Sequence, residues 1–199
     1  MTEHATRPFS LCVYCGSRTG TDPAHLEAAT QLGTAIGLRG WRLIYGGGRV
    51  GLMGAVADAA LAAGGTVIGV IPESLMRLEV GHRGLTELLV VRTMHERKQA
   101  MAERADAFVA LPGGIGTFEE LFEVWTWRHL GYHQNPIGLL DINGYYEPLM
   151  SFLGRAVAEG FVNDTQMSMI MRHADAATLL DELHGAAQAA LRSADLDRV

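Results

Sequence analysis

A glycine-rich segment carries residue types suited to holding a phosphate group. Gly113, Gly114 and Gly116 stand just ahead of Thr117 in the stretch 112–120, PGGIGTFEE. Glycines let backbone N–H groups approach an anion closely, and the start of a following helix adds partial positive charge. The threonine hydroxyl adds one more donor. No Gly-Lys-Ser/Thr follows, and the segment comes late in the chain, so it predicts a phosphate site unlike a Walker A loop or the usual dinucleotide fingerprint.

A second glycine cluster, GGGRVG at residues 46–51, precedes another predicted helix. Two interpretations are open at equal weight. The cluster either forms a second anion-binding loop or allows a helix to pack closely on a strand.

Charged residues gather after Thr93, in the stretch TMHERK. Thr93 and Glu96 fit the capping-box pattern, which predicts a structural role for Glu96. Arg97 and Lys98 then fall in or beside the first helical turn, where exposed cations are disfavoured by about 0.3–1 kcal/mol. Their position indicates a bound anion more than a solvated pair. Lys98 is also the only lysine in the chain.

Glu120 admits two interpretations. Thr117 and Glu120 fit a capping box, in which the carboxylate only accepts from a backbone N–H. Alternatively, the carboxylate faces positive charge that develops on a sugar during glycosidic cleavage. Cys12 and Cys15 are predicted to be inert core residues on opposite faces of a strand, and we expect no metal site.

Short apolar runs alternate with alanine-rich helical stretches, which predicts an α/β fold: a Rossmann-like doubly wound, mostly parallel sheet with helices on both faces. We expect one domain over residues 1–199, with flexible tails at 1–8 and 190–199. The predicted strands are 11–15, 42–45, 66–71, 87–91, 107–111 and 137–141, with a further short strand within 162–171. The predicted helices are 23–38, 52–63, 94–104, 117–130, 146–158 and 176–191. The unusual turns follow the first, second, fourth and fifth strands, and ligands in such sheets bind at the carboxyl ends of the strands.

Composition narrows the class of protein. The chain is 48% hydrophobic and 19% charged, which are values of a globular domain. A net charge of −6 does not suit a broad nucleic-acid-binding face, although one small anion needs only a local site. The sequence shows neither a membrane span nor a secretory signal, so we expect a cytoplasmic protein without membrane partners.

The motifs together resemble the Lonely Guy (LOG) family of cytokinin riboside 5′-monophosphate phosphoribohydrolases. The resemblance extends over roughly residues 9–185 and rests on six stretches: VYCGS at 13–17, the stretch 45–54 that begins YGGG, VIGVIP at 67–72, MHERK at 94–98, PGGIGTFEE at 112–120 and PIGLL at 136–140. It implies a homodimer without a cofactor. It also implies hydrolysis of a nucleoside 5′-monophosphate, such as AMP or a cytokinin nucleotide, to a free base and ribose 5-phosphate.

The resemblance also implies roles for residues. Arg97 and Glu120 match the family's catalytic arginine and glutamate. The residues matching substrate or phosphate contacts are Ser17, Gly47, Glu79, Met94, Lys98, Gly113, Gly114, Ile115, Gly116, Thr117, Glu119 and Thr126. His95 and Glu119 are the candidates for protonating the leaving base, and neither is preferred.

Two residues depart from the family pattern. Arg18 and Arg49 stand where small polar residues are commoner, and they would either tighten phosphate binding or exclude a bulky base.

Two other functions compete with the hydrolase. A pyridoxal phosphate decarboxylase would need Lys98 as its Schiff-base lysine. A non-catalytic nucleotide- or cofactor-binding module would need no catalytic pair, so the presence of both Arg97 and Glu120 favours an enzyme.

Overall fold

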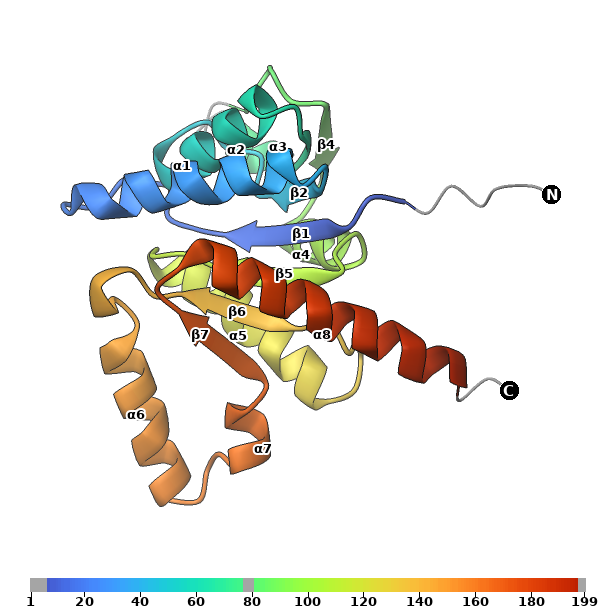
Figure 1. Ribbon diagram of the computed structural model, residues 1–199. Coiled ribbons are helices and arrows are strands. Elements are labelled where there is room, and N and C mark those ends of the chain that lie inside the picture. Colours follow the sequence, from blue (N-terminus) through green and yellow to red (C-terminus); the bar gives the residue numbers. More distant parts are fainter. Residues whose placement is uncertain (1–6, 77–80, 197–199) are drawn as a thin grey trace.

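The computed structural model describes residues 7–76 and 81–196, and its centre is a parallel sheet of seven strands (Figure 1). The strand order is β4-β3-β2-β1-β5-β6-β7, and every neighbouring pair is parallel. The strands are β1 (Ser10–Tyr14), β2 (Arg42–Tyr45), β3 (Thr66–Pro72), β4 (Glu87–Val91), β5 (Ala107–Ala110), β6 (Ile137–Leu140) and β7 (Ile170–His173). The predicted doubly wound α/β fold is confirmed.

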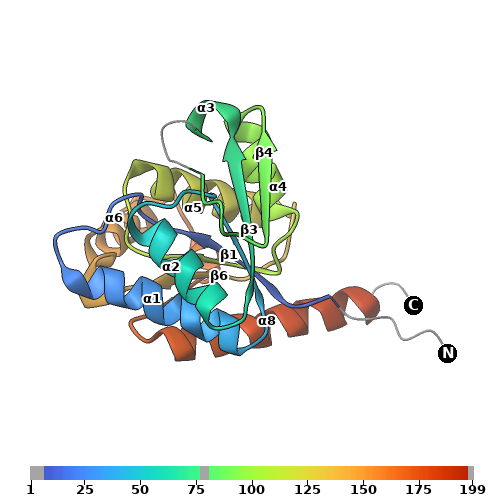
Figure 2. The same ribbon diagram turned by 90° about the horizontal axis from the view of Figure 1, so that it is seen from above.

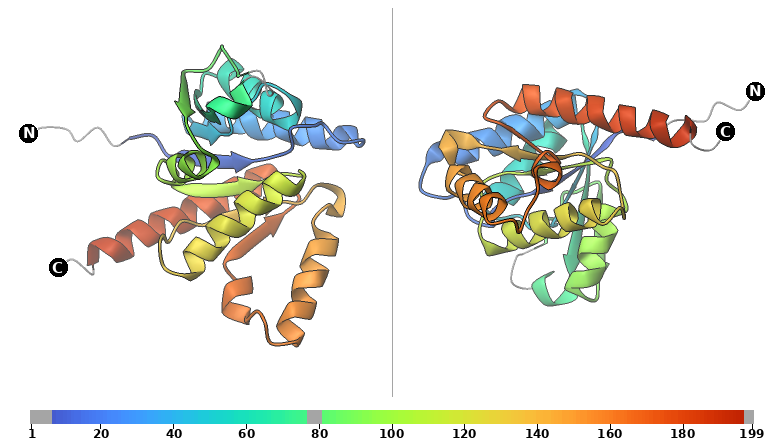
Figure 3. Two further views of the ribbon diagram at one scale, coloured as in Figure 1. Left: turned by 180° about the vertical axis from the view of Figure 1, so that it is seen from behind. Right: turned by 90° about the horizontal axis from the view of Figure 1, so that it is seen from below.

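Helices cover both faces of the sheet (Figures 2 and 3). One face packs against α1 (Pro23–Leu38), α2 (Gly51–Ala62) and α8 (Ala176–Leu196). The other packs against α4 (Met94–Ala102), α5 (Ile115–His129) and α6 (Glu147–Ala158). Shorter helical segments are α3 (Glu73–Met76), α7 (Asp164–Met167) and the 3-10 turn Ile142–Gly144. In the part of the chain that the structure describes, no helix is long and apolar enough to cross a bilayer.

Strand β1 shows why the sequence folds in this way. All five of its residues are buried, as expected for a strand covered on both faces. Cys12 packs in the core beneath α4 and α5, whereas Cys15 packs in the core beneath α1 and α2. Both cysteines are free and buried, which confirms the predicted core positions on opposite faces, and their inertness stays a prediction.

Some element bounds differ from those predicted. Helix α5 begins at Ile115, two residues before Thr117. Helix α8 continues to Leu196, through residues that we expected in a tail. The stretch 162–171 holds the unpredicted helix α7, which is capped at Asn163, before β7 begins.

The strand order creates a crevice between β1 and β5. From β1 the chain proceeds to β2, β3 and β4 on one side, whereas β5 leads to β6 and β7 on the other. The helices that follow these two strands, α1 and α5, therefore lie on opposite faces of the sheet. In open α/β sheets this reversal point is where ligands bind.

Helices α1 and α2 approach each other closely at two glycines of α1. A Cβ atom at Gly33 would lie 2.2 Å from the carbonyl oxygen of Val56, and one at Gly37 would lie 2.6 Å from that of Ala60. These glycines let α2 approach α1, and α2 begins in the loop that borders the crevice.

We expect Gly33→Ala to lower the free energy of unfolding by about 1–3 kcal/mol, because the new methyl group has no room. The matched control is Gly154→Ala in α6, where an added Cβ meets no atom within 4 Å. That change should stabilise the protein by about 0.5–1 kcal/mol, since alanine favours a helix. Denaturant unfolding of both variants measures the difference, and equal stabilities would contradict the packing described.

Candidate active site

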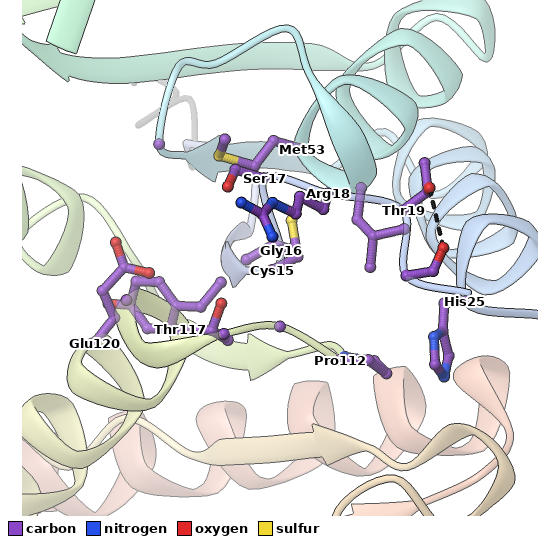
Figure 4. Close-up of a pocket in the computed structure, with 18 of the residues that line it drawn as sticks. Cys15, Gly16, Ser17, Arg18, Thr19, His25, Met53, Pro112, Thr117 and Glu120 are labelled. Atoms are coloured by element: carbon purple, nitrogen blue, oxygen red, sulfur yellow. Dashed lines mark hydrogen bonds between the residues drawn. The ribbon is translucent and has the colours of Figure 1, made fainter. Parts of the chain in front are cut away.

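A pocket of about 620 Å³ lies at the carboxyl ends of β1, β2 and β5 (Figure 4). The loop after β1 forms one wall, and the loop after β5 with the start of α5 forms the facing wall. The two loops touch, because the backbone N–H of Gly16 donates to the carbonyl of Pro112 at 3.1 Å. The pocket therefore sits at the reversal point of the sheet.

The glycine segment 113–116 opens one end of this pocket at the start of α5. Gly113 must lack a side chain, because a Cβ there would lie 2.1 Å from Oγ1 of Thr117. Gly114 and Gly116 are exposed, with no atom near the position of a Cβ. Thr117 is only 4% exposed and lines the pocket. The helix N-terminus, the bare backbone and this hydroxyl together form a cradle for an anion.

Of the two interpretations of Glu120, the capping box with Thr117 as its N-cap is wrong. The N-cap of α5 is Gly114, and the cap has no side-chain hydrogen bond. Because the glycines tolerate an early helix start, Thr117 and Glu120 lie inside the helix, three residues apart and on the same face. Glu120 is among the residues that line the pocket.

Arg97 and Glu120 form an ion pair inside the protein. Nη1 of Arg97 lies 3.1 Å from Oε1 of Glu120, and each side chain is less than a tenth exposed. Nε of Arg97 also donates to the carbonyl of Val70 at 3.1 Å, and Nη2 donates to that of Gly46 at 3.4 Å. One guanidinium thus connects α4, β3, the loop after β2 and α5.

Gly46 leaves the space that this guanidinium occupies. A Cβ at Gly46 would lie 2.0 Å from Nη2 of Arg97. In the same loop Gly47 adopts φ +76° and Gly51 adopts φ +61°, a region that glycine enters without strain. These glycines allow close approach, but of the Arg97 side chain and the turn after β1 rather than of a helix to a strand. The anion-binding interpretation of the cluster stays a prediction.

Helix α4 begins as predicted, with a small difference. Oγ1 of Thr93 accepts from the backbone N–H of Glu96 at 3.1 Å, which confirms Thr93 as the N-cap. The Glu96 carboxylate accepts from the N–H of Arg92 at 2.9 Å, so its structural role is confirmed with a different partner.

Carboxylates on α5 pair with the two cations at the start of α4. Lys98 pairs with Glu119 and with Glu123, the latter at 2.9 Å, outside the pocket. Their position near a helix start had indicated a bound anion. The structure instead gives both Arg97 and Lys98 carboxylate partners within the protein.

The pocket brings together most of the predicted site residues. Those that line it are Ser17, Arg97, Gly113, Gly114, Ile115, Gly116, Thr117 and Glu120. Those that lie in described parts of the chain but do not line it are Gly47, Met94, Lys98, Glu119 and Thr126. Glu79 lies outside the described residues. His95 is exposed and does not line the pocket either.

Thr126 lies in a different hollow. Its hydroxyl donates to the carbonyl of Phe122 at 2.7 Å. With Phe122 and His129 it borders a space of about 220 Å³.

Tyr145 and His25 are two of the pocket residues that sequence reasoning missed. The hydroxyl of Tyr145 donates to the carbonyl of Gly113, and its ring meets His25 edge-on, with ring centroids 5.6 Å apart. Tyr145 follows β6, so its place at the carboxyl edge of the sheet was the available signal.

Within the described ranges, no cluster of three or more His, Cys, Asp or Glu residues is arranged to hold a metal ion.

Known proteins resemble this chain closely. Residues 53–183 match the family described as "Possible lysine decarboxylase". A cytokinin riboside 5′-monophosphate phosphoribohydrolase of Rhodococcoides fascians is 52% identical over 82% of this chain and 83% of that protein. One from Arabidopsis thaliana is 46% identical over 92% of this chain and 84% of that protein.

A solved structure supports the fold. The molybdenum cofactor binding protein of Rippkaea orientalis superposes with a TM-score of 0.70 over 91% of this chain and 98% of that chain. Its sequence identity is 22%, so the likeness concerns the fold alone.

A cysteine that lines the pocket would be a nucleophile only if its thiol lost a proton to form the thiolate. Cys15 lines the pocket, and burial raises the pKa of its thiol, like that of Cys12, far above the usual range. Both thiols are therefore neutral at mildly alkaline pH, and the neutral form is a poor nucleophile.

We expect a chromogenic thiol reagent to modify neither cysteine in the folded protein and both after unfolding in guanidinium. Rapid modification of Cys15 in the folded protein would contradict this account of the pocket.

Proposed function

The chain belongs to the Lonely Guy (LOG) family of cytokinin riboside 5′-monophosphate phosphoribohydrolases, and on this premise we propose what it does. It hydrolyses the N-glycosidic bond of a purine or cytokinin riboside 5′-monophosphate, AMP included. The products are the free base and ribose 5-phosphate.

One observation carries the proposal: a phosphate cradle and a buried carboxylate share a pocket and a helix. Thr117 belongs to the cradle, and Glu120 lies one helical turn further along the same face of α5. A 5′-phosphate in the cradle would place the attached ribose next to Glu120.

The chemistry follows from this placement. As the bond from C1′ to the base breaks, its electrons leave with the base and positive charge develops on the sugar. The Glu120 carboxylate would stabilise that charge and orient the water whose oxygen bonds to C1′. Water supplies the hydroxyl group at C1′, and the base gains a proton. Arg97 would act by positioning the carboxylate, because its guanidinium holds Glu120 directly.

The phosphate would contribute although it does not react. Binding energy from a remote group can hold the reacting centre in a productive geometry. The rigid cradle at the start of α5 suits this purpose. A nucleoside without phosphate should therefore lose rate as well as affinity.

The two competing functions have less support. A pyridoxal phosphate enzyme would need a free lysine in its pocket, whereas Lys98 pairs with Glu119 and Glu123 outside it. A nucleotide carrier would need the cradle but has no use for a carboxylate held by a buried arginine. The Arg97–Glu120 pair therefore favours the hydrolase.

We also propose that the protein works in the cytoplasm as a homodimer. The dimer is supported by exposed apolar side chains in the middle of α5, directly after α5 and on α6. Phe122 is 37% exposed, and Leu130 and Phe152 are more than half exposed.

The proposed function is tested by a product assay on nucleotide and nucleoside pairs. We expect AMP and a cytokinin riboside monophosphate to release free base, and adenosine and the cytokinin riboside to do so at least about 100-fold more slowly, since the phosphate orients the sugar. Chromatography of the released base measures both rates. Equal rates with and without the phosphate would contradict the role of the cradle. If no nucleotide released a base, the hydrolase proposal would be wrong and the nucleotide-carrier function would be the remaining candidate.

A further inference from the structure

We propose that Arg18 is a substrate-binding residue that holds the 5′-phosphate from the side of the pocket facing the segment 113–117. The inference rests on the proposed function and assigns it a second phosphate-binding element. Arg18 belongs to the loop after β1, not to the glycine cradle.

The side chain of Arg18 is directed into the pocket. Arg18 is among the residues that line it. Figure 4 shows the side chain extending into the open space of the pocket, across from Thr117. An anion held by the cradle would have this guanidinium on its open side.

The backbone that carries Arg18 is fixed by neighbouring loops. Gly51 presses against it so closely that a Cβ there would lie 2.4 Å from the backbone nitrogen of Arg18. On the other side of the turn, a Cβ at Gly16 would lie 3.0 Å from the Arg18 carbonyl oxygen. The carbonyl of Gly16 also accepts from the N–H of Leu52 at 3.0 Å. The side chain is exposed, but its attachment point has little freedom.

The charge balance of the pocket leaves Arg18 available for an anion. Among the described residues that line the pocket, Glu120 is the one carboxylate, and it already pairs with Arg97. Arg18 forms no ion pair with any residue in the described ranges 7–76 and 81–196. Within that described lining, the two arginines Arg18 and Arg97 face one carboxylate, which leaves one more fixed positive charge than negative charge. A phosphate monoester, which carries about −1.5 to −2 charges near neutral pH, complements that excess.

Guanidinium geometry adds selectivity to charge. The planar fork of arginine can donate two parallel N–H bonds to two oxygens of one phosphate. The bare backbone and Thr117 would satisfy the opposite side of the phosphate group. Arg18 would therefore discriminate a nucleotide from the corresponding nucleoside.

Arg49 provides a matched control. It is the other arginine that departs from the family pattern, and it lies in the neighbouring loop after β2. It is exposed and does not line the pocket. Removing either arginine changes the net charge of the protein equally, but only Arg18 faces the site.

The experiment is a calorimetric titration of the wild type, Arg18→Gln and Arg49→Gln with ribose 5-phosphate and, separately, with inorganic phosphate. We expect Arg18→Gln to weaken the binding of both probes about tenfold or more, the usual effect of losing a charge-assisted hydrogen bond. Arg49→Gln should bind both as the wild type does. Arg18→Lys should lie between, since it keeps the charge without the fork. Thermal melting should show all variants folded, because both side chains are exposed.

The outcomes separate this inference from the proposed function. If Arg18→Gln binds as tightly as the wild type, or if Arg49→Gln weakens binding equally, the inference is wrong. Failure of the wild type to bind either probe would also overturn it. If phosphate binding depends on Arg18 but the wild type releases no base from any nucleotide, the inference stands and the proposed hydrolysis fails.

Discussion

The site depends on one buried interaction, the ion pair between Arg97 and Glu120. Two charges taken out of water cost several kcal/mol each unless close geometry and further hydrogen bonds offset the loss. The pair meets that condition, because Arg97 also donates to the carbonyls of Val70 and Gly46. Each of these partners belongs to a different element, so α4, α5, β3 and the loop after β2 must all be in place at once. A buried pair of this kind is poor evidence of high stability, but it specifies one arrangement of the pocket.

Glycines make that arrangement sterically possible. Gly46 leaves room for the guanidinium, Gly51 lets the loop after β2 press on the turn after β1, and Gly113 lets the cradle close on Thr117. In each case a Cβ would lie 2.4 Å or less from a neighbouring atom. The pocket is therefore built by close approach of backbones around one arginine and one glutamate.

Much of this could be predicted from the sequence, and particular residues show where the prediction stopped. Apolar runs such as Leu11–Val13 indicated strands buried on both faces, and the motif turns were correctly expected at one edge of the sheet. The partner of Arg97 could not be predicted, because α4 and α5 meet only in the folded chain. The misplaced start of α5 has a local cause: Thr117 is a strong N-cap residue in isolation, but the glycines before it allow the helix to begin earlier. Tyr145 carried no motif, and only its place after β6 could have indicated it.

The central claim is that the charge of Glu120 acts in the transition state, and the Glu120→Gln variant tests it most directly. Glutamine keeps the shape and a hydrogen bond to Arg97 but loses the charge. The account predicts that turnover of a nucleoside monophosphate falls about 100-fold or more, equivalent to about 2.7 kcal/mol. Binding of ribose 5-phosphate should persist, because the cradle is intact. Such binding would also show that the variant is folded.

Glu123→Gln is the matched control, since Glu123 lies on the same helix but pairs with Lys98 outside the pocket. Base-release kinetics and ribose 5-phosphate titration on the same preparations give the answer. Wild-type turnover in Glu120→Gln, or an equal loss in Glu123→Gln, would contradict the account.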